Sequence, residues 1–183
     1  MPFGHGSLRH LYLIETDEAL KLIESNPIDL RVINAQWYNY GMGDATAEFT
    51  AARMSKTTQH VRLEDVSDRF NPLPNMLCSV EQWTEHMRKL RIRKTDDILL
   101  YDHMGFYSVA RVALMFRYFG AQKVRIINGG MKKWALEGKP THGGEYIPGE
   151  GLESKGDYSY EVINEEIFVH NISHVHKAAQ KVF

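Results

Sequence analysis

The stretch from residue 97 to residue 127 constrains the fold of this chain most strongly. Two short apolar runs, DILLY (97–101) and KVRII (123–127), flank a longer segment at 107–119 that is apolar nearly all round. Runs of this length predict buried strands, and the segment between them predicts a largely buried helix. Parallel strands are joined by right-handed crossovers, so this spacing predicts a βαβ unit in a parallel sheet.

Capping signals and apolar periodicity predict further elements. In chain order these are a helix at 17–25, a strand at 30–34, a helix at 80–90 and a helix at 132–137. Thr16 is expected to cap the first helix, and Ser79 with Gln82 forms a capping box before the third element. Residues 35–58 show no sustained period and predict a long loop.

These elements predict one α/β domain at 15–142, with a central parallel sheet and helices on both faces. Residues 1–14 are expected to form an extended N-terminal arm, without the apolar core of a secretory signal. Residues 143–183 are expected to form an acidic, linker-like arm that ends in a short helix. Glycines and acids dominate 143–166, which predicts an extended and solvated segment.

Composition excludes several classes of protein. A single cysteine in 183 residues excludes an intrachain disulfide and a multi-cysteine zinc site. The net charge of −1 argues against a nucleic-acid partner. No apolar stretch approaches the roughly 20 residues of a transmembrane helix.

The loop between the strand at 97–101 and the following helix is the first candidate site. It comprises Asp102, His103, Met104, Gly105 and Phe106. Ligands of open α/β sheets bind beyond the carboxyl ends of the strands, where a helix N-terminus offers free N–H groups. A cysteine at the first position would be an activated nucleophile there. Asp102 stands in its place, and predicts a helix cap in preference to a general base or cation ligand.

The single cysteine and the histidines of the tail are weaker candidates. Cys78 precedes the predicted helix at 80–90 and is interpreted as a small packed residue. His170 and His174 would share one helix face, a spacing that can bind a transition metal. Such clusters are usually solvated, so we expect neither a metal nor any other cofactor.

A basic run begins at the C-terminal end of the predicted helix at 80–90 and continues beyond it. Its five charged residues are Arg88, Lys89, Arg91, Arg93 and Lys94. Bases gather at helix C-termini because the helix dipole favours them there. The alternative is an exposed contact for a partner, and this run is the best candidate for one.

The segment at 98–140 resembles the rhodanese family, and within it the N-terminal, non-catalytic half of tandem thiosulfate or 3-mercaptopyruvate sulfurtransferases. Residues 30–38 and 71–83 resemble the first long strand and the proline-containing approach to the next helix, and 158–178 resembles the interdomain linker. The features that carry the resemblance are Tyr101-Asp102, Gly105-Phe106, Ala110-Arg111, Arg117-Tyr118-Phe119-Gly120, Val124, Gly129-Gly130, Lys133-Trp134 and Gly138.

The chain also departs from the family pattern. An Asp and an Arg that usually follow the first strand are replaced by Asn34 and Gln36, which removes a charge pair between loops. The Gly-His-Ile-Pro-Gly-Ala signature expected before residue 60 is absent from the aligned stretch at 53–58. The family's active-site cysteine loop belongs to a second domain, before which this sequence ends.

The resemblance and its departures imply a catalytically inactive domain, with no catalytic residue, that serves as a structural or binding accessory subunit. We expect protein partners in a hetero-oligomeric assembly, with the mitochondrion as compartment and the cytoplasm as the alternative. A second hypothesis is the non-catalytic half of a sulfurtransferase whose catalytic domain is missing or lies on another chain. A third is a binder of small anions or metal ions that uses the Asp102 loop or the tail histidines.

Overall fold

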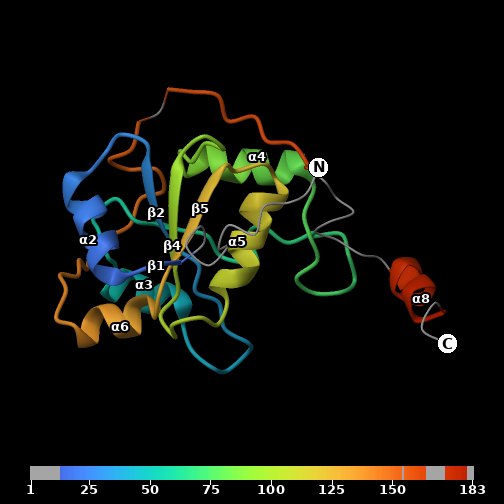
Figure 1. Ribbon diagram of the computed structural model, residues 1–183, viewed down its shortest axis with the longest axis horizontal. Coiled ribbons are helices and arrows are strands. Elements are labelled where there is room, and N and C mark those ends of the chain that lie inside the picture. The colour runs from blue at the N-terminus through green and yellow to red at the C-terminus, as the bar shows by residue number, and fades with distance from the viewer. Residues whose placement is uncertain (1–12, 154, 164–171, 181–183) are drawn as a thin grey trace, which may run out of the picture.

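A computed structural model describes residues 13–153, 155–163 and 172–180, and its centre is an all-parallel sheet (Figure 1). The sheet order is β1-β5-β4-β2-β3. Its strands are β1 (Leu13–Ile14), β2 (Leu30–Asn34), β3 (Gln59–His60), β4 (Asp97–Tyr101) and β5 (Lys123–Ile127). The three long strands have the predicted bounds, and β4, α5 (Val109–Tyr118) and β5 form the predicted βαβ unit.

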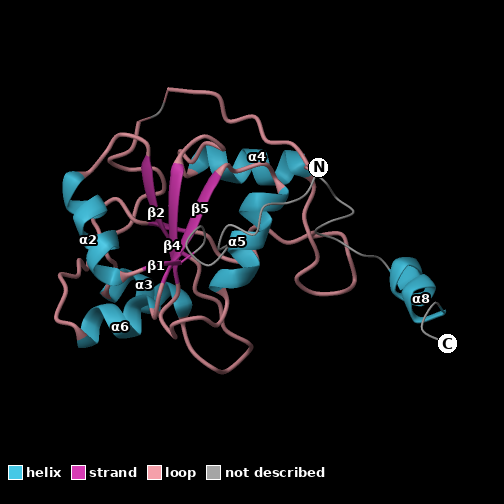
Figure 2. Cartoon of the chain, viewed as in Figure 1, coloured by secondary structure: helices cyan, strands magenta, loops and turns pink. Residues whose placement is uncertain are grey.

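Helices cover both faces of the sheet, as Figure 2 shows. Helices α4 (Val80–Lys89) and α5 pack on one face, and α2 (Thr16–Ser25) and α6 (Gly130–Leu136) pack on the other. Successive strand residues point to opposite faces. In β4, Ile98 and Leu100 therefore enter the core under α4 and α5, while Leu99 and Tyr101 enter the core under α2 and α6.

A cluster of aromatic rings fills the core on the α4 and α5 side. Trp83 stacks on Phe119 with ring centroids 4.7 Å apart, and it meets Phe116 edge-on at 4.9 Å. Tyr160, from the segment after the last sheet strand, approaches the same indole at 6.0 Å. Helix α4 begins as predicted, because the Ser79 hydroxyl accepts a hydrogen bond from the Gln82 N–H.

The predicted loop at 35–58 contains a helix, α3 (Ala45–Ala51). Asp44 caps this helix, and its carboxylate accepts hydrogen bonds from the N–H groups of Thr46 and Ala47. Seven residues make only two turns, too few for an apolar period to stand out, and packing of Phe49 stabilises them. The expectation of an uninterrupted loop is therefore wrong.

Two predicted helix starts also differ. Thr16 is the first residue of α2 and not its cap; the preceding Glu15 makes no side-chain cap bond. The Thr16 hydroxyl instead donates to the Glu137 carboxylate, a tertiary contact that local patterning does not reveal. Helix α6 begins at Gly130, two residues before the predicted start, because Gly129 turns the chain with a positive φ of 78°.

The segments at 143–153 and 155–163 are extended and mostly exposed, as expected, but a few of their residues pack on the domain. Tyr158 and Tyr160 are buried, and the Tyr160 hydroxyl donates to the Ile92 carbonyl at 3.0 Å. The Arg91 guanidinium donates to the Leu152 carbonyl at 2.7 Å. The buried tyrosine rings attach these residues to the core. Hydrogen bonds from arginine to backbone carbonyls hold them along α4 and the turn that follows it.

The ends of the domain add one strand and one helix. Strand β1 lies within the predicted N-terminal arm and pairs in parallel with β5, so the sheet begins at Leu13. Helix α8 (Ile172–Gln180) lies where a short C-terminal helix was predicted. Among residues 13–153, 155–163 and 172–180, no helix is long and apolar enough to span a membrane.

Replacing Tyr160 by Ala should lower the free energy of unfolding by about 3 kcal/mol, because a buried ring and its hydrogen bond are lost. Val162→Ala in the same segment is the matched control, since Val162 is exposed. Urea unfolding measures both. Equal stability of the two variants would show that this segment does not pack on the core.

Candidate functional site

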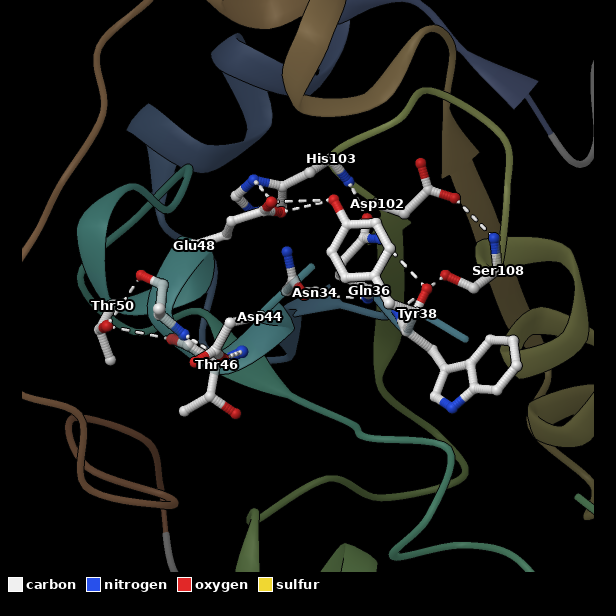
Figure 3. A network of polar contacts seen from close by, with 12 residues as sticks. Asn34, Gln36, Tyr38, Asp44, Thr46, Glu48, Thr50, Asp102, His103 and Ser108 are labelled. Carbon is white, nitrogen blue, oxygen red and sulfur yellow. Dashed lines mark hydrogen bonds and ion pairs between the residues drawn. The ribbon is translucent and has the colours of Figure 1, made fainter. Parts of the chain in front are cut away.

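The loop at 102–108 lies at the carboxyl end of β4 and leads into α5 (Figure 3). Here the backbone turns so that successive N–H groups converge on one point. In an open α/β sheet such a position binds anionic or reacting groups. The side chain that occupies this point decides what the loop can do.

The Asp102 carboxylate occupies the point on which these N–H groups converge. One oxygen accepts from the Gly105 N–H at 2.6 Å, and the other accepts from the N–H groups of Tyr107, Ser108 and Val109 at 2.5, 2.9 and 3.2 Å. Asp102 is fully buried. These contacts agree with the interpretation of Asp102 as a helix cap, since Val109 is the first residue of α5.

Ser108 ties this loop to the chain that follows β2. Its hydroxyl donates to the Ala35 carbonyl at 2.7 Å and accepts from the Trp37 N–H at 3.1 Å. Both contacts join segments more than 70 residues apart in the sequence. The sequence offered no signal for this role, because an isolated serine beside a helix start is common.

Asn34 and Gln36, which replace a charged pair of the family pattern, still connect the loops. The Asn34 side-chain oxygen accepts from the Gln36 N–H at 3.0 Å, and the Gln36 side-chain oxygen accepts from the His103 N–H at 2.7 Å. Both residues are fully buried. Neutral amides thus hold the loop without the desolvation cost of a buried ion pair.

The glycine turn after β5 closes the site from the other side. The Met131 N–H donates to the Asp102 carbonyl at 2.9 Å. A Cβ atom on Gly130 would lie 2.3 Å from that carbonyl oxygen, so only glycine permits this approach. The Gly129-Gly130 pair therefore lets α6 begin directly against the Asp102 loop.

Helix α3 brings the Glu48 carboxylate close to the loop, and the sequence did not predict this contact. The Tyr38 hydroxyl donates to both Glu48 oxygens, at 2.9 and 2.8 Å, and His103 Nδ1 lies 3.6 Å from Glu48 (Figure 3). Burial and the Glu48 carboxylate raise the pKa of Tyr38 to about 12. Burial lowers the pKa of His103, although Glu48 and Asp102 oppose the shift. Tyr38 therefore keeps its proton at neutral pH.

Cys78 lies away from the loop, in the core on the α4 and α5 side. Burial raises the pKa of its thiol to about 11. At neutral pH the thiol is therefore protonated and unreactive. The structure agrees with the interpretation of Cys78 as a packed residue.

The basic run divides into two groups. Arg91 binds the Leu152 carbonyl, Arg93 pairs with Asp96 at 2.7 Å, and Lys94 pairs with Glu161 at 2.9 Å. These three bind the chain itself. Arg88 and Lys89 are exposed, and Lys89 pairs with Glu85. A partner contact at the five basic residues stays a prediction.

The two tail histidines weighed as weak metal candidates are not tested by the structure. His170 lies outside the described residues, and His174 lies in α8. In the described part of the chain, no three His, Cys, Asp or Glu side chains are grouped as metal ligands.

Two surface cavities lie away from the Asp102 loop, and both have linings that mix polar and apolar atoms about equally. One of about 590 Å³ lies between α4 and residues 156–160. The other, of about 540 Å³, includes Arg53, Lys56 and His142 in its wall.

The family model of the rhodanese-like domain matches residues 15–137, which is more than half of the chain. The chain belongs to the rhodanese-like domain family. Its parallel sheet, the βαβ unit and the loop at the carboxyl end of β4 are the family's expected features, and the predicted fold is confirmed.

Similar proteins are sulfurtransferases. The chain is 33% identical over 111 residues to thiosulfate/3-mercaptopyruvate sulfurtransferase 1, mitochondrial, of Arabidopsis thaliana, with 60% of this chain and 29% of that protein covered. It is 30% identical over 122 residues to human 3-mercaptopyruvate sulfurtransferase, with 65% and 41% covered. The chain thus spans less than half the length of these relatives.

Solved structures show the same fold. SseA from Escherichia coli, described as a 3-mercaptopyruvate sulfotransferase, superposes with a TM-score of 0.80 at 22% identity, over 93% of this chain and 62% of that chain. The sulfur transferase subunit of yeast mitochondrial complex I gives a TM-score of 0.58 at 22% identity, over 64% of this chain and 38% of that chain.

Asp102→Asn should lower the free energy of unfolding by about 3 kcal/mol, because an amide cannot accept from all four N–H groups and leaves buried donors unpaired. Asp44→Asn is the matched control. Only one Asp44 oxygen accepts from α3, and Asn caps a helix as well as Asp, so we expect a change within about 0.5 kcal/mol. Chemical denaturation that affects both variants equally would contradict this role of Asp102.

His60 should make the protein less stable in acid. Burial lowers its pKa from 6.5 to about 4 in the folded state. Between these values the unfolded chain binds more protons, so stability falls as pH falls from 6.5 to 4, by roughly 3 kcal/mol. His60→Phe keeps a ring on Phe49 and should flatten this part of the stability curve, measured by denaturation at a series of pH values.

The stability of His60→Phe should still fall somewhat with falling pH, because burial also lowers the pKa values of His86 and His103. Replacing the exposed His176 by Phe is the control and should leave the slope unchanged. An unaltered slope in His60→Phe would contradict the prediction.

Proposed function

We propose that this chain is a catalytically inactive rhodanese-like domain that serves as a structural or binding subunit of a larger protein assembly. One observation carries the proposal: the Asp102 carboxylate binds the four N–H groups that converge in the loop after β4. A loop whose donors are bound to its own carboxylate has none of these four left for a reacting anion. The buried negative charge would also repel an anionic sulfur donor.

The chemistry of sulfur transfer supports the same proposal. A group that receives sulfur must be a nucleophile, and carboxylate oxygens cannot form a persulfide. The single thiol of the sequence is Cys78, which is buried and has a raised pKa. Nothing in the described part of the chain places this thiol in the loop.

The similar proteins support a mitochondrial assembly as the place of this function. One relative is named as mitochondrial, and one solved structure with the same fold is described as a subunit of mitochondrial complex I. We infer from these that this chain has protein partners in a mitochondrial complex, with the cytoplasm as the alternative compartment.

A second candidate function follows from the length of this chain compared with its sulfurtransferase relatives. The chain spans 29% and 41% of the two sulfurtransferases compared above. It would then be the non-catalytic half of a thiosulfate or 3-mercaptopyruvate sulfurtransferase whose cysteine-bearing domain is missing or lies on another chain. In that case activity belongs to the complex and not to this chain.

With thiosulfate or 3-mercaptopyruvate as donor, the purified chain should transfer sulfur no faster than its Cys78→Ser variant, because neither protein presents a thiolate in the loop. A sulfurtransferase assay that compares the two proteins at equal concentration measures this. Turnover above the Cys78→Ser control would overturn the proposed inactivity.

Purification of the tagged chain from native extract, with size and composition analysis, tests the subunit role. We expect a complex much larger than the 21.1 kDa chain. A free monomer would contradict the subunit role. A partner with a cysteine-loop rhodanese domain, together with turnover by the complex, would favour the second function over the first.

A further inference from the structure

Two loops at the carboxyl end of the sheet carry large apolar side chains that the fold does not bury. The loop after β2 presents Tyr40 and Met42, and the loop after β4 presents Met104, Phe106 and Tyr107. We call these five side chains the apolar loop patch. None of them has a role in the core of the domain.

The two loops lie side by side. The Tyr107 hydroxyl donates to the Met42 sulfur at 3.9 Å. Figure 1 shows the blue-green loop after β2 extending below the lower end of the sheet, where the loop after β4 also turns. The patch is therefore one surface made from two segments.

The fold holds the second loop in a fixed shape. The Asp102 carboxylate binds the N–H groups of Gly105 and Tyr107, which flank Phe106. Gln36 binds the N–H of His103, which precedes Met104. A surface that is ordered before it binds loses less entropy on association.

The patch is large for a surface that meets only water. Tyr40 is 106% exposed, Phe106 58% and Met42 54%. A whole side chain of this size has a surface of about 150–250 Å². Multiplied by the exposed fractions, the five side chains together expose roughly 600 Å². This reaches the upper end of apolar patches on monomers and approaches the roughly 800 Å² that each partner buries in a standard interface.

The charge of the patch limits its occupant. Residues 39–43 and 104–107 contain no Asp, Glu, Lys or Arg. A charged group placed directly on these residues would lose its hydration without gaining an opposite charge, and the exposed carboxylate of Asp44 follows only at the end of the first segment. Aromatic side chains and Met are enriched in the buried centre of interfaces, and charged residues are depleted there, which is the composition of this patch.

The shape of the patch argues against a second copy of this chain. Symmetric dimers bring the same surface of both subunits together, and two projecting loop tips offer each other no socket. Both cavities found in the described part of the chain have charged side chains in their walls, among them Glu81 and Arg88 in one and Arg53 and Lys56 in the other. An apolar side chain from another copy would desolvate these charged groups.

We propose that the apolar loop patch is the docking surface for a different protein, whose contact face is uncharged and has an apolar socket for Tyr40 and Phe106. This rests on the proposed subunit function and specifies where the partner binds. The loop after β4 thus presents side chains to a partner, while Asp102 holds that loop in place.

The test compares two double variants of the full-length chain, both made at exposed positions. Tyr40→Ser with Phe106→Ser removes the patch; Ile28→Ser with Leu136→Ser removes exposed apolar side chains elsewhere, at 71% and 81% exposure. Thermal melting checks that both fold. Each double variant and the unaltered chain are purified from native extract. In a separate experiment, a photo-crosslinking amino acid replaces Phe106 or Ile28 in the otherwise unaltered chain.

We expect the patch variant to recover at least about tenfold less partner than the unaltered chain, and the control variant to change recovery less than twofold. Position 106 should crosslink to an apolar stretch of a different protein, and position 28 should not. Equal recovery by both variants would leave the subunit function intact and overturn the docking surface. Crosslinking of position 106 to a second copy would overturn the choice of partner, and the absence of any partner of the unaltered chain would overturn both proposals.

Discussion

The structure around the candidate site depends on one interaction, the binding of four backbone N–H groups by the Asp102 carboxylate. The side chain fixes the loop and begins α5, while its own carbonyl accepts from Met131 at the start of α6. Ser108, whose N–H the carboxylate binds, connects the same loop to the chain after β2. One buried anion with full hydrogen bonding thereby joins three segments at the carboxyl end of the sheet.

This arrangement relates the fold of the family to the function proposed for this member. The loop keeps the geometry that gathers N–H donors, but the chain's own carboxylate binds those donors. In the proposed function these loop positions contact a partner in place of a substrate, and Phe106 and Met104 are exposed there. A catalytic loop needs a reactive group within it, whereas a docking loop needs only a fixed backbone and an apolar tip.

Much of the fold could be predicted because its signals are local. Strands β2, β4 and β5 are buried apolar runs, and Ser79 marks the start of α4. Helix α3 could not be predicted, since seven residues held by the packing of Phe49 carry no clear period. The packing of Tyr160 was also missed, because an acidic, glycine-rich segment has the composition of a solvated arm and its contacts are distant in sequence.

The sequence by itself determined the family, the parallel βαβ centre and the substitution of Asp102 for a nucleophile, because each depends on residues close together in the chain. Only the tertiary structure showed that Gln36 and Glu48 approach that loop and that Ser108 within it binds the chain after β2. It also showed that Arg91 binds the chain's own C-terminal segment. Side chains that far-separated segments bring together leave no pattern in one sequence, since distance along the chain does not determine distance in the fold.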